Sequence, residues 1–465
     1  MVDTAITNGR VVTERAVTDA DVGITDGRIT AITAPGTLHT TATDVIDAAG
    51  RLVLPGFIDS HVHVNLELGE YTTTDEMSDL TRAAAHGGVT TVIPFAVPDR
   101  DESPLAALGR RREEAAGDAY VDYSFHGCLT EATETSLAQV PELIDRGATS
   151  IKAFMVYEDR LMLDNGELRD VMDRTADAGG TMLVHAEDNA IIGRLIERHR
   201  EQGDMAYDAH ADTHPPVSET AAMWTVSELV AESECPTLLV HASARRTEEI
   251  ATHAERNDLP LAVETCPHYL ALTDEVYGRD DGEAFVCSPP VRSNEHREAL
   301  MEMVSSSRVA VVNSDHCGYT MSQKRRHRDD ITRMPNGLPG VETTGPVLHT
   351  EAVTSGAASI RQFVRLMSTN VAKLFGLYPE KGTIAVGSDA DIVIFDPDEE
   401  WTIEPESLHM ATDYSPFQGR SVTGRAETVL VRGERVVDGG LVGSPTVGEY
   451  CHRTPESAGR HYREL

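Results

Sequence analysis

Two histidines separated by one residue carry the most distinctive chemistry in the sequence. His61 and His63 end the run PGFIDSHVH, which follows the apolar residues LVL. Alternate side chains of a β-strand lie on the same face, so both imidazoles should point one way and Val62 and Val64 the other way. The pair suits a metal ion, although two hydrogen-bonded core histidines would give the same pattern.

Further residues with ligand or basic side chains stand near the ends of later apolar runs. Each alone has an ordinary alternative, such as a core histidine, a paired buried lysine or a helix-capping aspartate. Together with the first pair they favour a two-metal hydrolytic site, because imidazole and carboxylate suit Zn²⁺ and also Mn²⁺ or Co²⁺. These residues and their runs are Lys152 in 150–156, His185 in 181–186, His241 in 237–243 and Asp315 in 309–315.

A lysine stands where a bridging ligand would be needed. Lysine occurs only at Lys152, Lys324, Lys373 and Lys381, and arginine supplies the rest of the Lys and Arg total. A free ammonium would repel two metal ions, whereas the carbamate formed from a neutral amine and CO₂ would bridge them through oxygen. Arginine cannot take this role because its guanidinium stays protonated. We therefore expect Lys152 to be carboxylated.

The middle of the chain alternates strand-like and helix-like segments. Roughly eight such units predict a (β/α)₈ TIM-like barrel of α/β class, whose functional residues lie at the carboxyl ends of the strands. Ser218 and Ser293 are expected helix N-caps. The loop 316–346 is long for a compact domain, which points to function. Strands are expected at 53–59, 90–97, 121–129, 150–156, 181–186, 237–243, 261–266 and 309–315, and helices at 75–88, 103–117, 218–232 and 293–307.

Both ends of the chain are rich in short β segments. Asn8-Gly9 and Asp26-Gly27 are hairpin signals near the N-terminus, and 383–397 and 427–440 are β-rich near the C-terminus. This arrangement predicts a small β-sandwich domain formed by residues 1–52 and 380–465, and a catalytic barrel formed by residues 53–379. Pro55-Gly56 would mark the passage between the two domains.

The charge balance excludes some partners. Asp and Glu number 76 against 40 Lys and Arg, a net charge of −36, so neither nucleic acid nor an anionic membrane is an expected partner. The acidic residues are scattered, as on a halophilic surface adapted to high salt. The 6 cysteines form no CxxC motif, and no signal peptide or membrane-spanning apolar stretch is evident. We expect a soluble cytoplasmic protein with reduced thiols.

The chain resembles the cyclic amidohydrolases of the amidohydrolase superfamily, and among them the dihydropyrimidinases and D-hydantoinases. The resemblance covers nearly the whole chain. GTIAVGSDADIVIFDP is shared widely among amidohydrolases, whereas IKAFMVY with SPPVR and MPNG is more specific. The motifs that carry the resemblance are PGFIDSHVH, AAAHGGVTTVI, VDYSFH, IKAFMVY, CSPPVR, NSDHC, MPNGLPGVE, STNVAKLFGLYPEKGTIAVGSDADIVIFDP and DYSPFQGRSVTGR.

The resemblance implies a role for each candidate residue. Tyr157 would donate a hydrogen bond to the developing oxyanion, and Ser288 and Asn336 would hold the imide or ureide edge of the substrate, largely through main-chain groups. By residue type alone, Ser288 and Asn336 are ordinary turn residues. Of the metal ligands, His61, His63 and Asp315 would hold one ion, His185 and His241 the other, and carboxylated Lys152 would bridge them.

These parts imply a mechanism for opening a cyclic amide such as a dihydropyrimidine or a hydantoin. A metal-bridging hydroxide attacks the ring carbonyl, and Tyr157 with a metal ion stabilises the oxyanion. Asp315 takes the proton and passes it to the departing nitrogen, which releases an N-carbamoyl amino acid. The substrate is a small molecule, and the family resemblance implies a homotetramer.

Two other functions are compatible with parts of the pattern. Allantoinases share the metal residues, but they usually lack a tyrosine at the position of Tyr157, and the segment FAVP at 95–98 also argues against them. A non-catalytic interaction homologue would have lost metal ligands, and here every position is occupied. His214 and the segment 158–165 depart from the usual family pattern, and 158–165 would set substrate preference if it faces the ring substituent.

Overall fold

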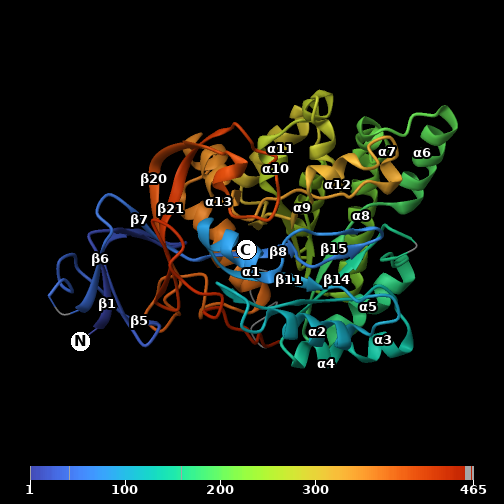
Figure 1. The fold of residues 1–465 in the computed structure, drawn as a ribbon. Coiled ribbons are helices and arrows are strands. Elements are labelled where there is room, and N and C mark those ends of the chain that lie inside the picture. Colours follow the sequence, from blue (N-terminus) through green and yellow to red (C-terminus); the bar gives the residue numbers. More distant parts are fainter. Residues whose placement is uncertain (1, 41, 159, 456–461, 463–465) are drawn as a thin grey trace.

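The computed structural model describes residues 2–40, 42–158, 160–455 and 462. A parallel sheet with surrounding helices forms one part, and mixed sheets from the two ends of the chain form the other (Figure 1). In Figure 1 the mixed sheets lie to the left and contain both the blue N-terminal strands and the red C-terminal strands. The expected combination of a TIM-like barrel and a β-sandwich is therefore confirmed.

The parallel sheet is curled, and its two ends are joined by one short segment. β18 pairs with β17 at one end of the sheet, while β19, which follows closely in the chain, pairs with β8 at the other end. The central strands are buried along their length, as expected for a parallel sheet covered on its outer face. The strands are β8 (Phe57–His63), β11 (Val89–Ala96), β12 (Asp122–Tyr123), β13 (His126–Cys128), β14 (Ser150–Phe154), β15 (Thr181–His185), β16 (Thr237–Leu239), β17 (Leu261–Thr265), β18 (Val311–Val312) and β19 (His316–Cys317).

Helices pack around this sheet, as α1 does on β11 and α5 on β15 (Figure 1). None of the helices among the described residues is both long and apolar enough to cross a membrane. The helices are α1 (Met77–His86), α2 (Pro104–Ala115), α3 (Glu134–Ala138), α4 (Val140–Asp145), α5 (Asn165–Asp177), α6 (Asn189–Gln202), α7 (His210–Thr213), α8 (Pro216–Ser233), α9 (Thr247–Arg256), α10 (Pro267–Ala271), α11 (Asn294–Ser305), α12 (Met321–Arg325), α13 (Thr344–Leu348), α14 (Ile360–Val364) and α15 (Asn370–Phe375).

The two expected helix caps had different outcomes. Ser293 occupies the N-cap position of α11, as expected, although its side chain makes no capping hydrogen bond. The expectation for Ser218 was wrong, because α8 already begins at Pro216 and the Ser218 hydroxyl donates to the Pro215 carbonyl inside the first turn. A proline in the first turn starts a helix without losing a backbone hydrogen bond, which explains the earlier start.

The sandwich consists of a four-stranded sheet and a six-stranded sheet. The first uses only N-terminal strands, in the order β5-β4-β1-β6, whereas the second, β22-β21-β20-β7-β2-β3, takes strands from both ends of the chain. Their facing apolar side chains form one cluster, which includes Ile6, Ile392 and Leu430. The strands are β1 (Val2–Thr7), β2 (Arg10–Val12), β3 (Val17–Asp19), β4 (Asp21–Thr25), β5 (Arg28–Thr33), β6 (Ala42–Asp47), β7 (Leu52–Pro55), β20 (Ile392–Thr402), β21 (Ser421–Val431) and β22 (Glu434–Asp438).

Only one of the two hairpin signals forms a hairpin. Asp26 and Gly27 have φ values of 49° and 73° and join β4 to β5, which pair antiparallel. Asn8 also has a positive φ, but β1 and β2 on either side of it belong to different sheets. The chain crosses between the sheets at Asn8-Gly9, so the hairpin expected there was wrong.

The passage between the sheets of the sandwich and the barrel falls at Pro55-Gly56. β7 belongs to the six-stranded sheet and β8 to the curled sheet, with Gly56 between them. Near the C-terminus, the Glu449 carbonyl accepts from the Tyr123 amide, and the buried Arg453 donates to the Ser124 hydroxyl over 2.9 Å. The C-terminal segment therefore contacts the barrel, and the division into 1–52 with 380–465 and 53–379 stays a prediction.

The segment 316–346 has more secondary structure than expected of a long loop. It contains β19, α12 and a 3-10 turn at Ile331–Arg333, and the Cys317 amide donates to the Leu338 carbonyl over 2.9 Å. This hydrogen bond joins the start of the segment to its later part. The segment begins in the curled sheet, where β19 pairs with β8.

A buried ion-pair cluster links the barrel to the sandwich. Lys381 Nζ lies 2.6 Å from carboxylate oxygens of both Asp122 and Asp391, and 3.1 Å from Asp389. The Lys381→Met substitution would leave several buried carboxylates without their shared cation. We expect it to lower the free energy of unfolding by about 3–5 kcal/mol. Urea unfolding followed by circular dichroism measures this, and a loss below about 1 kcal/mol would contradict the role of the cluster.

Candidate metal centre

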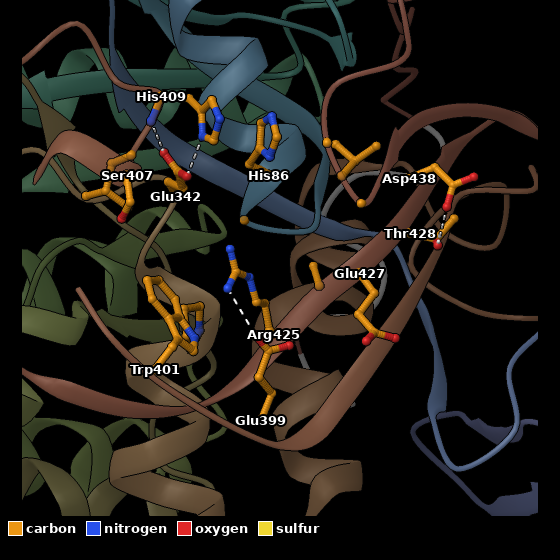
Figure 2. A pocket seen from close by; sticks show the side chains of 17 residues that line it. His86, Glu342, Glu399, Trp401, Ser407, His409, Arg425, Glu427, Thr428 and Asp438 are labelled. Carbon is orange, nitrogen blue, oxygen red and sulfur yellow. Dashed lines mark hydrogen bonds and ion pairs between the residues drawn. The ribbon is translucent and has the colours of Figure 1, made fainter. Parts of the chain in front are cut away.

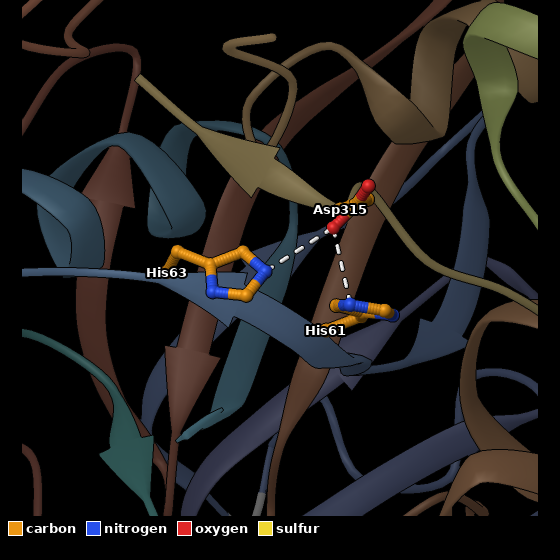
Figure 3. Close-up of side chains that lie close together, drawn as sticks. All are labelled: His61, His63 and Asp315. Carbon is orange, nitrogen blue, oxygen red and sulfur yellow. Dashed lines mark ion pairs between the residues drawn. The ribbon is translucent and has the colours of Figure 1, made fainter. Parts of the chain in front are cut away.

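Three of the expected ligands converge at the carboxyl end of β8 (Figure 3). His61 Nε2 lies 3.1 Å and His63 Nε2 lies 3.3 Å from the same oxygen of Asp315. Only 1% of the His61 side chain is exposed, whereas His63 and Asp315 keep 13% each. The group is therefore mostly enclosed, and the parts of it that remain exposed belong to His63 and Asp315. It forms a candidate metal-binding cluster.

A second pair of imidazoles lies beside the first group. His241 Nε2 is 2.9 Å from His185 Nδ1, and the ring centroids of His61 and His241 are 5.3 Å apart. The other nitrogen of His185 lies 2.9 Å from a carboxylate oxygen of Glu187. Because a carboxylate accepts, His185 donates from Nε2 and its Nδ1 lone pair faces His241. The two histidines thus direct nitrogen atoms toward one place.

The strands next to this pair are shorter than the apolar runs suggested. β16 ends at Leu239 and β18 at Val312, so His241 and Asp315 follow the strands instead of ending them. His241 has a φ of 42° and Asp315 a φ of 49°, conformations that interrupt a β ladder. Such strained residues cluster at functional sites, where the surrounding structure holds them in place.

Lys152 lies on β14 between these two groups and is completely buried. Among the described residues, its Nζ has no hydrogen-bond partner, and it lies 4.9 Å from the ring centroids of Phe95 and Phe154. Burial lowers the pKa of Lys152 to about 8, while the carboxylate of Asp315 opposes that change. An unpaired buried amine is costly, so protein contacts alone do not explain this lysine.

The protonation states of these side chains are those that metal ligands need, because a metal ion binds to a free lone pair. Burial lowers the pKa of His63 to about 4 and that of His241 well below its usual value, so both imidazoles are neutral near pH 7. Burial would raise the pKa of Asp315, but the adjacent His61 and His63 hold it well below its ordinary value. The carboxylate of Asp315 is therefore ionised, while the imidazoles of His63 and His241 are neutral.

Glu264 orients this group and was not recognised in the sequence. It is fully buried, and one of its oxygens accepts from His61 Nδ1 over 2.6 Å and from the His241 amide over 2.9 Å. Its other oxygen accepts from Asn313 Nδ2 over 2.6 Å. The contact with Glu264 fixes the orientation of the His61 ring. A single acidic residue inside the apolar strand LAVET was the available signal.

The three residues expected to contact substrate come together beside the histidines. Asn336 Nδ2 donates to the Ser288 hydroxyl over 3.1 Å, and both side chains interact with the phenol of Tyr157. The Tyr157 and His185 ring centroids are 5.6 Å apart. Burial, and then the charge of Glu187, raise the pKa of Tyr157, so its hydroxyl stays protonated and can donate. Tyr157 also has a φ of 71°.

His214 and the segment 158–165, which depart from the family pattern, both make contacts that the structure describes. The His214 carbonyl accepts a hydrogen bond from Arg292, whose guanidinium also pairs with Glu219. In the segment 158–165, Leu161 is buried and Arg160 donates to the Pro98 carbonyl over 2.7 Å. Asp159 lies outside the described residues.

A cavity of about 680 Å³ lies elsewhere, between the end of α1 and strands β20 and β21 (Figure 2). Its wall includes His86 and His409, whose rings stack at 3.5 Å, and Arg425, which lies 3.0 Å from Glu399. His409 is also paired with Glu342. None of the expected metal ligands lines this cavity, so its volume does not locate the chemistry.

Comparison with known proteins places the chain in a family. The sequence profile of the amidohydrolase family matches residues 52–436, so the chain belongs to that family. It is 38% identical over 458 residues to a D-hydantoinase of Geobacillus stearothermophilus, with 97% of each chain covered. The crystal structure of dihydropyrimidinase from Brevibacillus agri matches with a TM-score of 0.95 and 37% identity, covering 97% of this chain and 99% of that one.

A structure of the L-hydantoinase (dihydropyrimidinase) from Arthrobacter aurescens is also similar, at 30% identity and a TM-score of 0.91, covering 97% of this chain and all of that one. Relatives with these names extend over nearly the full length of the chain. The protein is therefore an amidohydrolase of the hydantoinase and dihydropyrimidinase type, a cyclic amide hydrolase. The resemblance expected from the sequence is confirmed.

Proposed function

We propose that this protein opens the ring of dihydropyrimidines or hydantoins by hydrolysis and releases an N-carbamoyl amino acid. The observation that carries the proposal is the convergence of His61, His63 and Asp315 beside the unpaired, buried amine of Lys152. The names of the relatives, which include D-hydantoinase, L-hydantoinase and dihydropyrimidinase, support the substrate class but leave open which ring is preferred.

The residues present fit two divalent ions. His61, His63 and Asp315 would hold one ion, and the facing nitrogens of His185 and His241 the other. Zn²⁺ is the proposed ion, with Mn²⁺ or Co²⁺ as alternatives that bind the same donors. Lys152, as a carbamate, would contribute oxygen to both, which explains an amine that has no protein partner among the described residues. When bound, such ions activate water and polarise a carbonyl group.

The side chains of this protein would carry the remaining steps. Asp315, ionised at neutral pH, accepts the proton of the attacking water and passes it to the departing ring nitrogen. The protonated phenol of Tyr157 donates a hydrogen bond to the carbonyl oxygen as negative charge develops there. Ser288 and Asn336 bind the imide or ureide edge of the ring.

A substrate panel tests the proposal. Purified protein loaded with Zn²⁺, Mn²⁺ or Co²⁺ in high salt would be assayed with dihydrouracil, 5-substituted hydantoins of each hand, and allantoin. We expect opening of dihydrouracil or a hydantoin to exceed that of allantoin. Preference for allantoin would identify an allantoinase, and protein without bound metal or turnover would point to a non-catalytic interaction homologue.

Glu264 offers a separate test of the metal site. Its contact with His61 fixes the orientation of a ligand, and loss of such a contact typically weakens metal binding. We expect Glu264→Gln to lower metal affinity by about 10–100-fold in competition with a chelator. The same substitution at the exposed Glu232 should leave affinity unchanged. Equal affinities in the two variants would contradict the role of Glu264.

The remaining expectations concern the setting of the enzyme. We propose a homotetramer, from the family resemblance, which light scattering after size-exclusion chromatography tests.

All of the cysteines are free, which supports a reducing, cytoplasmic location. The net charge of −36 supports a halophilic enzyme whose unfolding temperature rises with salt concentration, because salt screens repulsion between its carboxylates.

A further inference from the structure

Lys324 is a buried lysine that the proposed mechanism does not use. It lies on α12, and its side chain is fully buried. Its Nζ donates to the carbonyl oxygen of Val286 over 2.7 Å and to that of Pro335 over 3.0 Å, and it lies 5.7 Å from the ring centroid of Tyr319. The ammonium thus joins two main-chain segments that are distant in sequence.

These two segments carry the residues proposed to hold the substrate ring. Val286 lies two positions before Ser288, and Pro335 lies immediately before Asn336. The Val286 carbonyl also accepts from the Gly337 amide over 3.1 Å, so this oxygen receives hydrogen bonds both from Lys324 and from the segment that carries Asn336. Beyond it, Asn336 Nδ2 donates to the Ser288 hydroxyl.

The segment that carries Asn336 packs closely against β19. A Cβ atom added at Gly337 would lie 2.6 Å from the Cβ of Cys317, so the backbone of Gly337 must pack directly against β19. The segment that carries Asn336 is therefore seated closely against β19. Lys324 contacts the carbonyls of both segments, in addition to the direct hydrogen bond from the Gly337 amide to Val286.

Burying this ammonium is unfavourable by itself. Burial lowers the pKa of Lys324 to about 8, which shows the cost of keeping its charge in this place. Two short hydrogen bonds to carbonyl oxygens offset part of that cost, and a charged donor makes them stronger than neutral ones. A compact three-donor ammonium suits two carbonyls at one point, whereas a planar guanidinium would need more space.

We propose that Lys324 is a positioning residue for substrate binding. Its ammonium binds the segment before Ser288 and the segment before Asn336 together, an arrangement that we call the clamp. The clamp thereby fixes the separation between Ser288 and Asn336, the two residues that bind the imide or ureide group of the ring. This inference rests on the proposed function, because it assigns the clamp to the substrate site of the same reaction. The contacts by which Lys324 joins the two segments do not depend on which ring the enzyme opens.

The Lys324→Met variant, with a neutral side chain of similar length, tests the clamp. The proposed contacts to the ring form in the ground state as well as in the transition state, so their loss weakens both equally. We expect KM for dihydrouracil or a hydantoin to rise about tenfold or more, with kcat within about threefold and a full metal content. Lys324→Gln, which keeps one donating group, should give an intermediate KM.

Amide hydrogen exchange tests, without any substrate, whether Lys324 holds the two segments together. Lys324→Met should accelerate exchange in 286–291 and 334–338, because opening of these segments becomes easier. Lys373→Met, the same substitution at the half-buried Lys373 on α15, is the matched control and should change neither KM nor exchange. Circular dichroism establishes that each variant is folded.

The outcomes separate the inference from the proposed function. Unchanged exchange in both segments, or an unchanged KM, would overturn the role of Lys324. A fall in kcat with metal loss and an unaltered KM would also overturn it, since the effect would then lie at the metal centre. Wild-type protein that opens none of the rings would overturn the proposed function, and accelerated exchange in Lys324→Met would then still support the clamp.

Discussion

Asp315→Asn is expected to lower kcat by about a thousandfold or more, the range typical of losing a positioned proton acceptor and donor. The asparagine keeps the size of the side chain, but its amide cannot take a proton from water at neutral pH. Asp315 is ionised in the structure because His61 and His63 hold its pKa well below the usual value despite burial. Turnover of dihydrouracil or a hydantoin by the metal-loaded variant measures the effect.

Metal analysis of the same samples makes this result interpretable. Asp315 is also a proposed ligand, so kcat must be expressed per metal-loaded site. Asp398→Asn, the same substitution at an exposed position of β20, should retain full turnover. Near wild-type kcat together with a full metal content in Asp315→Asn would refute the assignment of Asp315 as the proton-transfer residue.

The Lys152→Arg substitution is expected to remove most of the bound metal and to lower turnover by about a thousandfold or more, because carbonyl polarisation by metal is worth several kcal/mol. Arginine keeps the positive charge and most of the length but cannot form a carbamate. Lys152 is buried and has no hydrogen-bond partner among the described residues, so its ammonium makes no direct polar contact there. Metal content and kcat are the measurements.

A second variant distinguishes a missing bridge from a misfolded site. Lys152→Ala would leave a cavity at the place of the amine, and added acetate or propionate should restore part of the metal content and turnover. Lys373→Arg is the matched control at a position outside the site. Full metal content and turnover in Lys152→Arg, or a metal-loaded crystal structure with a plain ammonium at Lys152, would contradict carboxylation.

Local patterns in the sequence predicted much of the fold. Apolar runs located the barrel strands because a parallel sheet buries its strands on both faces. The alternation around Val62 correctly placed His61 and His63 on one face, since both reach Asp315. The N-cap predicted at Ser218 failed for a local reason, the proline that starts α8 two residues earlier, whereas the failed hairpin depended on longer-range context. Asn8-Gly9 has the residue types of a hairpin turn, but its flanking strands pair with other partners in two different sheets.

The sequence by itself determined which side chains can do chemistry and that they follow apolar strands. Only the tertiary structure decided which buried polar groups meet. Glu264 reaches His61 from another strand, and Lys324 joins the carbonyls of Val286 and Pro335. The physical reason is that each buried polar group must find a partner among whatever segments the fold brings beside it. Hydrophobic periodicity reports only which face of one segment is buried, and it carries no information about that partner.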